Sequence, residues 1–227
     1  MNANVPPSPE IGVFRSSLRT PRAAAIAGIA FAVLLTTALV LVRLAVPPES
    51  HDAGTWLDHS DRKRAVEVAL NLVPFAGLAF LWFIGAVRDR IGAAEDRFFA
   101  TVFLGTGLLF VAMLFIASAV AGGLLGAETD RPAHVSREVW RFGRHTSYEV
   151  LAVYALRMAG AFTIVTTTIG RRLRILPRWL TVLGGTFGVV LLLTVESFAW
   201  LALLFPLWVL VLSIYLLIHS QTDRAAT

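Results

Sequence analysis

Arg157 is the residue whose type and position most clearly suggest chemistry. It is the only charged residue between Glu149 and Arg171. A helix that starts at Ser147 would place Arg157 about 15 Å along its axis, near the midplane of a bilayer. A charge at that depth costs several kcal/mol, so the guanidinium should face protein or water. Two interpretations are open: a structural arginine that ties helices together, or the centre of a ligand or ion site.

Three glutamates near the ends of apolar stretches are candidate partners for Arg157. Glu67, Glu149 and Glu196 each fall within about one helical turn of the same predicted membrane edge. With Arg157 they would outline an outward-facing polar vestibule, suited to a cationic substrate or a proton. Carboxylates at helix ends are also ordinary, because water solvates them there. The vestibule therefore depends on these side chains converging in space.

Pro74 introduces a further polar group. A proline inside a helix cannot donate to the carbonyl four residues earlier, so the carbonyl of Leu70 is left to accept another hydrogen bond. Either Arg157 or the side chain of Asn71 is expected to donate to it. Asn71 is therefore a further candidate ligand-binding residue, and the alternative is a stabilised kink.

The segment that follows the first apolar stretch contains residues that bind metals in other proteins. His51 and Asp52 precede His59, and these are donor types for zinc or another divalent ion. Their spacing matches no ligand pattern, and loop histidines and aspartates are far commoner than ligands. His134 and His145 would have to join them to complete a site.

No sequence motif indicates catalysis or a cofactor. The chain contains no Gly-x-Ser-x-Gly, no His-Glu-x-x-His and no glycine-rich phosphate loop followed by lysine and serine. No cofactor is expected, and an enzyme is the least favoured functional class. The absence of cysteine excludes disulfides and thiolate metal sites.

A short basic turn suits the surface of a membrane. It contains four arginines and no acid, and its expected partners are anionic lipid headgroups, at about 1 kcal/mol per charge. The four are Arg171, Arg172, Arg174 and Arg178. Arginines throughout the chain lie beside apolar stretches rather than among aromatic residues, which favours lipid headgroups and argues against nucleic acid.

Membrane helices must position all of these residues. Of 227 residues, 56% are hydrophobic and 15% are charged, too few to cover a soluble globule of this size. A helix needs about 20 apolar residues to cross the hydrocarbon. Six stretches meet that test: roughly 23–42, 66–87, 98–125, 147–170, 179–195 and 198–218. The sequence predicts an all-α, polytopic membrane helix bundle with six transmembrane helices at 23–219, a disordered tail at 1–22 and a tail at 220–227.

The last two stretches form one apolar run of about forty residues, twice the length of one crossing. A tight turn is therefore expected near Glu196 and Ser197, the strongly polar pair inside that run. The first stretch is expected to be an uncleaved helix, because it exceeds a usual signal core and no small-x-small cleavage site precedes Pro47.

Basic residues near the helix ends predict the orientation. They divide eleven to eight in favour of the side that holds both termini, and cytoplasmic loops retain arginine and lysine. Both termini are therefore expected in the cytoplasm. An excess of alanine and arginine suggests a GC-rich bacterial genome, which places the chain in the cytoplasmic (inner) membrane of a bacterium.

Small residues and one proline predict how the helices pack. Gly184-x-x-x-Gly188, and the run that contains Ser118 and Gly122, allow close helix approach within the chain or in an oligomer. Pro206 predicts a kink in the last helix. A faint internal repeat would make Glu67 and Glu149 equivalent positions in two duplicated helical hairpins. The alternative is that the similarity is not a duplication, because helix ends in any membrane protein share such residues.

Two segments carry a resemblance to a known group of proteins. They are Arg174-Ile-Leu-Pro-Arg-Trp-Leu180, followed by Gly184-Gly185, and Glu95-Asp96-Arg97-Phe98-Phe99. There the chain resembles uncharacterised multi-pass membrane proteins of actinobacteria, over Trp56 to Leu217. The resemblance implies a helical membrane fold and a membrane location, and it implies no activity.

Three functional classes follow from the sequence. The first is a non-enzymatic membrane component or accessory subunit, whose partners are the bilayer and another membrane protein or a second copy of the chain. The second is a small transporter or sensor that uses the vestibule around Arg157. The third is a metal-dependent intramembrane enzyme that uses His51, Asp52 and His59.

Overall fold

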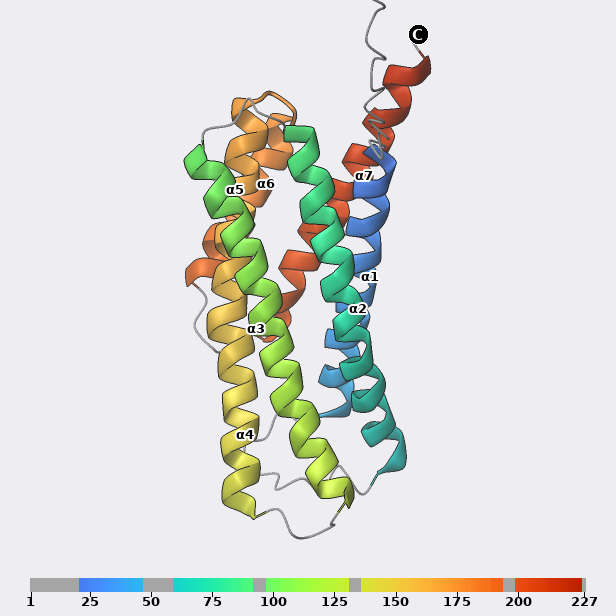
Figure 1. Cartoon of the computed structure of the whole chain (residues 1–227), viewed down its shortest axis with the longest axis vertical. Coiled ribbons are helices and arrows are strands. Elements are labelled where there is room, and N and C mark those ends of the chain that lie inside the picture. Colours follow the sequence, from blue (N-terminus) through green and yellow to red (C-terminus); the bar gives the residue numbers. More distant parts are fainter. Residues whose placement is uncertain (1–20, 47–58, 92–96, 131–135, 194–198, 226–227) are drawn as a thin grey trace, which may run out of the picture.

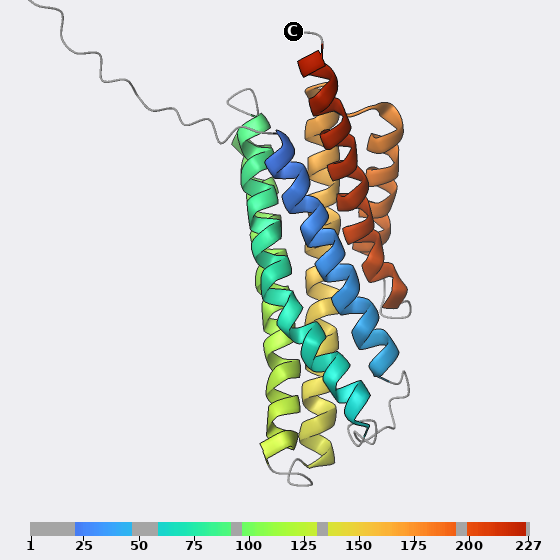
Figure 2. The same ribbon diagram turned by 90° about the vertical axis from the view of Figure 1, so that its right-hand side faces the viewer.

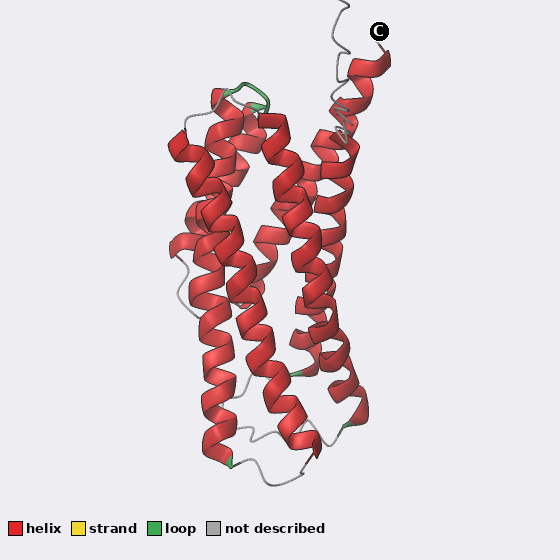
Figure 3. Cartoon of the chain, viewed as in Figure 1, coloured by secondary structure: helices red, strands yellow, loops and turns green. Residues whose placement is uncertain are grey.

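The computed structural model describes residues 21–46, 59–91, 97–130, 136–193 and 199–225. Within these ranges every regular element is a helix and none is a strand (Figure 3). The elements are α1 (Pro21–Ala45), α2 (Ser60–Ile91), α3 (Arg97–Asp130), α4 (Arg137–Glu149), the π-helical turn η3 (Val150–Ala155), α5 (Leu156–Arg172), α6 (Arg178–Leu193), the 3₁₀ segment η4 (Ala199–Leu203) and α7 (Leu204–Ala225). The predicted all-α class is confirmed.

The chain is a polytopic membrane helix bundle. α4, η3 and α5 run on as one helix, and in the described part of the chain five helices are long and apolar enough to cross a membrane. α6 is a sixth, shorter apolar helix of 16 residues. At 1.5 Å per residue it extends about 24 Å, somewhat less than the roughly 30 Å of a hydrocarbon core.

The helices close a ring. Contacts join α1 to α2, α2 to α3, α3 to α5, α5 to α6, α6 to α7, and α7 back to α1. The start of α1 and the end of α7 lie at one end of the bundle, together with the α5–α6 turn (Figures 1 and 2). That end is named the inner end here, after the predicted orientation, and the opposite end, where α3 approaches α4, is named the outer end.

The outer end extends further than the apolar stretches predict. The helix that contains the predicted span 147–170 begins ten residues earlier, at Arg137, where the Ser136 hydroxyl caps it. α4 is amphipathic, because Trp140 and Gly143 are buried while Arg141 and His145 are exposed. Figure 2 shows that α3 and α4 continue past the hairpin of α6 and α7.

The two predicted irregularities near the C-terminus have different outcomes. α6 ends at Leu193 and η4 begins at Ala199, on either side of the predicted turn; Glu196 and Ser197 themselves fall outside the described residues. Pro206 is the third residue of α7, and the 3₁₀ segment η4 runs directly into that helix. The hydrogen-bonding pattern therefore changes two residues before the proline, and the kink at Pro206 stays a prediction.

Phenylalanine rings from five helices meet around Phe80 of α2. Phe80 is fully buried. Its ring centroid lies 4.5 to 5.5 Å from four others, mostly in tilted or edge-on pairs. The four rings belong to Phe31 (α1), Phe110 (α3), Phe162 (α5) and Phe205 (α7). Edge-on pairs are favoured by the ring quadrupole and contribute about 0.5–1.5 kcal/mol each beyond burial. This phenylalanine cluster fills the middle of the ring of helices.

α6 joins the bundle through glycines rather than through the phenylalanine cluster. A methyl group on Gly160 of α5 would lie 2.8 Å from the carbonyl oxygen of Gly188, so the two backbones are in direct contact there. Gly184 lies against Thr167 and Trp208 in the same way. The predicted close approach at Gly184-x-x-x-Gly188 is confirmed, and it serves packing within the chain.

Replacement of Phe80 by alanine should destabilise the bundle strongly. The change removes a ring that four helices contact, at a cost of about 3–5 kcal/mol. Phe75, also on α2 but 63% exposed on the outside of the bundle, is the matched control. Thermal unfolding in detergent should show a large decrease in the unfolding temperature for Phe80→Ala and a small decrease for Phe75→Ala. Equal effects would contradict the central position of Phe80.

Candidate functional site

The π-helical turn η3 decides which way Arg157 points. Its extra residue is visible in the bond from the N–H of Leu156 to the carbonyl of Leu151, five residues back. Before the turn the buried side of the helix contains Trp140 and Gly143; after it the buried side contains Leu156 and Ala159. One inserted residue rotates a helix face by about 100°.

That rotation directs Arg157 away from the bundle. Without η3, continuing the α4 face would bring Tyr154 and Met158 inward; with it, Tyr154 and Arg157 are exposed. π turns are rare and frequent at functional sites, because the register shift they impose has an energetic cost. The turn therefore gives α5 an outward face with a cation and an aromatic ring in adjacent turns.

Arg157 lies about halfway between the midplane of the bilayer and its outer edge. It precedes Arg172, at the inner end of α5, by fifteen residues or about 22 Å. About 8 Å then remains to the outer edge of a 30 Å core. This distance replaces the midplane estimate, which assumed a helix start at Ser147. Helical side chains point toward the helix N-terminus, here the outer end, so the guanidinium can reach the interface.

Among the described residues, the side chain of Arg157 makes no ion pair and no hydrogen bond. Its side chain is exposed rather than enclosed by neighbouring helices. The charge must therefore be solvated from outside the bundle, by interfacial water, a lipid headgroup or another protein.

Asn71 does not use the carbonyl that Pro74 leaves free. Its side-chain amide donates to the carbonyl of Glu67 at 2.9 Å. The prediction of a bond to Leu70 is wrong, because a helical side chain points toward the preceding turn and reaches the carbonyl four residues back. Asn71 and Glu67 are both exposed on the outer surface of α2.

Among the described vestibule residues, Glu67 and Arg157 do not lie together. Glu67 and Arg157 are exposed on α2 and α5, which are separated in the ring by α3. Glu149 is half-buried at the end of α4, and Glu196 lies outside the described residues. Glu67, Glu149 and Arg157 are not among the lining residues of the outer-end cavity or of a second cavity that extends from Ala24 to Leu216.

The predicted metal site is largely outside the described residues. His51, Asp52 and His134 are not described, while His59 and His145 are exposed. Within the described ranges no three histidine, aspartate or glutamate side chains gather in a way that could hold a metal ion.

A cavity at the outer end brings together residues that the sequence analysis did not single out. It has a volume of about 120 Å³ and lies between α1, α2, α3 and the α4–η3 segment. Arg144, Tyr148 and Trp140 line it. The helical spacing of Trp140, Arg144 and Ser147 across the start of a membrane helix was a usable signal, since it marks an amphipathic face.

The basic turn between α5 and α6 has a defined backbone. The N–H of Ile175 bonds to the carbonyl of Gly170 at 2.9 Å, and that of Arg174 bonds to Arg171 at 3.1 Å. This pair of bonds is a Schellman motif, whose left-handed position is usually glycine. Here that position is Arg174, with φ 54°.

All four arginines of the turn are exposed, as contact with lipid headgroups requires. Arg172 also lies over the ring of Phe99 in α3, with 4.3 Å between guanidinium carbon and ring centroid. That distance is within the range of a cation–π interaction, so this arginine fixes the turn against α3. Headgroup binding by the turn stays a prediction.

Comparison with known proteins gives no relative. No family model, no curated protein and no solved structure matches the chain.

Replacement of Arg174 by glycine should stabilise the protein. A side chain in the left-handed region costs roughly 1–2 kcal/mol, and glycine removes most of that cost. Arg178→Gly, in the first turn of α6, is the control and should destabilise by up to about 1 kcal/mol. Thermal unfolding in detergent measures both. A loss of stability in Arg174→Gly would show that this arginine stabilises the turn by more than its strain.

Proposed function

We propose that the protein is a non-enzymatic component of a bacterial cytoplasmic membrane that binds another membrane protein along the outward face of α5. The observation that carries this proposal is the exposed Arg157, turned outward by η3 beside Tyr154, which is 54% exposed. A cation about 8 Å inside the hydrocarbon edge is best matched by an acidic side chain on a neighbouring helix. Tyrosine and arginine are also the residues that contribute most to protein interfaces.

The interior of the bundle supports binding at its surface better than transport through its centre. The phenylalanine cluster packs the middle with rings from five helices. Transport or sensing through a vestibule would require Arg157 and the glutamates to line one cavity. The described side chains Glu67 and Arg157 instead point outward from separate helices.

Buried hydroxyl groups of α5 support the same conclusion. Thr163, Thr166 and Thr167 are buried, and each donates to a carbonyl of its own helix at 2.7 to 2.9 Å. Hydroxyls committed in this way offer no donor to a passing substrate. The polar chemistry of α5 is thus concentrated at its outward face.

A photoreactive amino acid at position 154 tests the proposed interface. In cells, the Tyr154 variant should crosslink to a second membrane protein, and the yield should fall roughly tenfold when Arg157→Met removes the charge. Arg157→Lys should restore most of it. The matched control is the same photoreactive residue at Leu78, which is exposed on α2 and should give no such adduct.

Stability separates this function from a structural role of Arg157. Because the side chain is exposed, Arg157→Met should change the free energy of unfolding by no more than about 0.5 kcal/mol. Adducts at position 154 that persist unchanged in Arg157→Met, or that contain lipid alone, would contradict the proposal and leave Arg157 as a residue solvated at the interface.

Single cysteines test the proposed orientation. The chain has no cysteine of its own, so Arg141→Cys in α4 and Arg174→Cys in the basic turn introduce unique thiols, both at exposed positions. A membrane-impermeant maleimide added outside intact spheroplasts should label position 141 and not position 174. Labelling in the reverse pattern would place both termini outside.

A further inference from the structure

We propose that the outer-end cavity binds the headgroup-proximal part of one acyl chain of an anionic phospholipid, with Arg144 and Tyr148 holding the phosphate. This site is separate from the outward face of α5 and does not depend on the function proposed for that face.

The cavity has the walls that an alkyl chain requires. Its volume is about 120 Å³, and eight of its twelve lining residues are valine, leucine or alanine. The eight are Val42, Val46, Val66, Leu70, Ala121, Leu124, Leu125 and Leu151. An apolar cavity of about 150 Å³ holds a molecule the size of benzene, so this one accepts a few methylene groups and excludes a whole lipid or a nucleotide.

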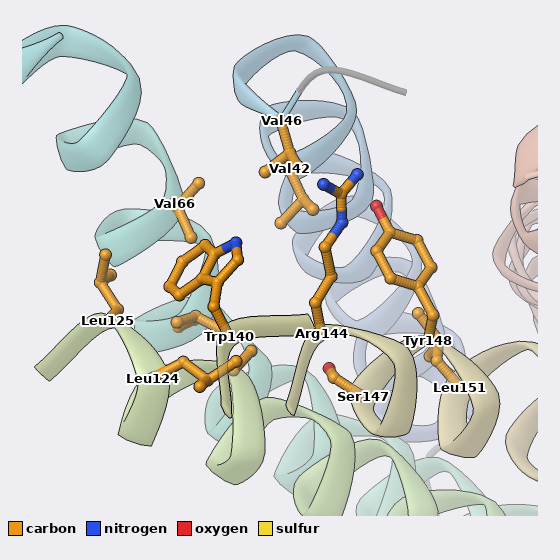
Figure 4. A pocket seen from close by; sticks show the side chains of 12 residues that line it. Val42, Val46, Val66, Leu124, Leu125, Trp140, Arg144, Ser147, Tyr148 and Leu151 are labelled. Atoms are coloured by element: carbon orange, nitrogen blue, oxygen red, sulfur yellow. The ribbon is translucent and has the colours of Figure 1, made fainter. Parts of the chain in front are cut away.

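Hydrogen-bond donors gather on one side of these walls. Figure 4 shows the guanidinium of Arg144 beside the hydroxyl of Tyr148, with the indole nitrogen of Trp140 directed to the same side. The Arg144 guanidinium carbon lies 5.8 Å from the centroid of the Tyr148 ring, which holds the long side chain in place.

The polarity of the cavity favours an anion. None of the twelve lining residues is acidic, and Arg144 is the charged one among them. The hydroxyl of Ser147 is already committed, since it donates to the carbonyl of Ala117 at 2.8 Å. Arginine, the tyrosine hydroxyl and the indole N–H are all donors, which matches the acceptor oxygens of a phosphate.

The depth of the cavity matches the boundary between hydrocarbon and headgroups. Twenty residues, about 30 Å, separate Arg22 at the inner end of α1 from Val42, which lines the cavity. The same distance from Arg88 along α2 reaches Val68, between the lining residues Val66 and Leu70. The cavity therefore straddles the predicted outer edge, where an acyl chain meets its phosphate.

Charged residues of both signs surround this edge of the bundle. Among the described residues at the outer end, seven are basic and six are acidic. The basic ones are Arg43, Arg62, Lys63, Arg64, Arg137, Arg141 and Arg144, and the acidic ones are Asp61, Glu67, Glu128, Asp130, Glu138 and Glu149. Because the two signs nearly balance, the selection of an anionic lipid depends on the cavity itself, where Arg144 is the charged lining residue.

Native mass spectrometry of the purified full chain with added lipid tests the proposal. The protein should retain phosphatidylglycerol roughly tenfold better than phosphatidylcholine of the same chain length. Both lipids carry a phosphate, but the choline cation of phosphatidylcholine cancels its charge and is repelled by the Arg144 guanidinium. Arg144→Met should abolish that preference, and Arg144→Lys should keep part of it. Arg141→Met, an exposed arginine of the same helix that does not line the cavity, should behave as the wild type.

A cavity-filling variant tests the acyl-chain half of the proposal. Ala121→Leu places added methyl groups inside the cavity and should lower the retention of both lipids severalfold, while thermal unfolding shows that the bundle is intact. Three results would overturn the proposal: equal retention of the two lipids by the wild type, equal losses in Arg144→Met and Arg141→Met, or undiminished binding by Ala121→Leu. The second result would mean that the basic surface as a whole attracts the lipid.

Discussion

The packing of phenylalanine rings around Phe80 holds this bundle together. Inside a bilayer, apolar side chains gain nothing by leaving lipid for protein, so helices associate through close packing and backbone contact. Rings from α1, α2, α3, α5 and α7 meet at Phe80, and α6 is added through the contact of Gly160 with Gly188. The order of the helices in the ring follows from these two kinds of contact.

A filled centre leaves the surface and the outer end as the places where polar groups can act. The extra residue of η3 turns Arg157 outward, and the same register shift lets α4 present Trp140 and Arg144 to the outer cavity while α5 presents Phe162 to the phenylalanine cluster. One local irregularity therefore serves both ends of a 36-residue helix. A regular α-helix without the π turn could make only one of these two contacts, because its α4 and α5 parts would be in a different register.

The sequence predicts the membrane-spanning helices well, because the length of an apolar stretch can be compared directly with the thickness of the hydrocarbon core. The hairpin between α6 and η4 was predicted from length alone, and the helices end and begin on either side of it. The start of α4 at Arg137 was missed because hydropathy does not detect a helix that continues beyond the hydrocarbon. Its amphipathic pattern, with Trp140 and Gly143 buried, was present in the sequence.

The directions of the polar side chains could not be predicted in the same way. A π turn has no recognisable sequence pattern, because the packing of the helices on either side stabilises it. When the π turn is not known, the position of Arg157 along the helix predicts its depth in the membrane but not whether its side chain points into or out of the bundle. The bond from Asn71 to Glu67 is different: the geometry of a helical side chain is enough to predict it.

The accessibility of the bundle centre to water tests the account most directly. Ala76 is fully buried one turn from Phe80, and Ala76→Cys would place a single thiol there in a chain with no other cysteine. An impermeant maleimide applied to both faces of the membrane should leave this thiol unlabelled until the protein is denatured, while His59→Cys, at an exposed position, reacts at once. Rapid labelling of Ala76→Cys in the native membrane would contradict the account, because it would show a water-filled path through the middle of the bundle.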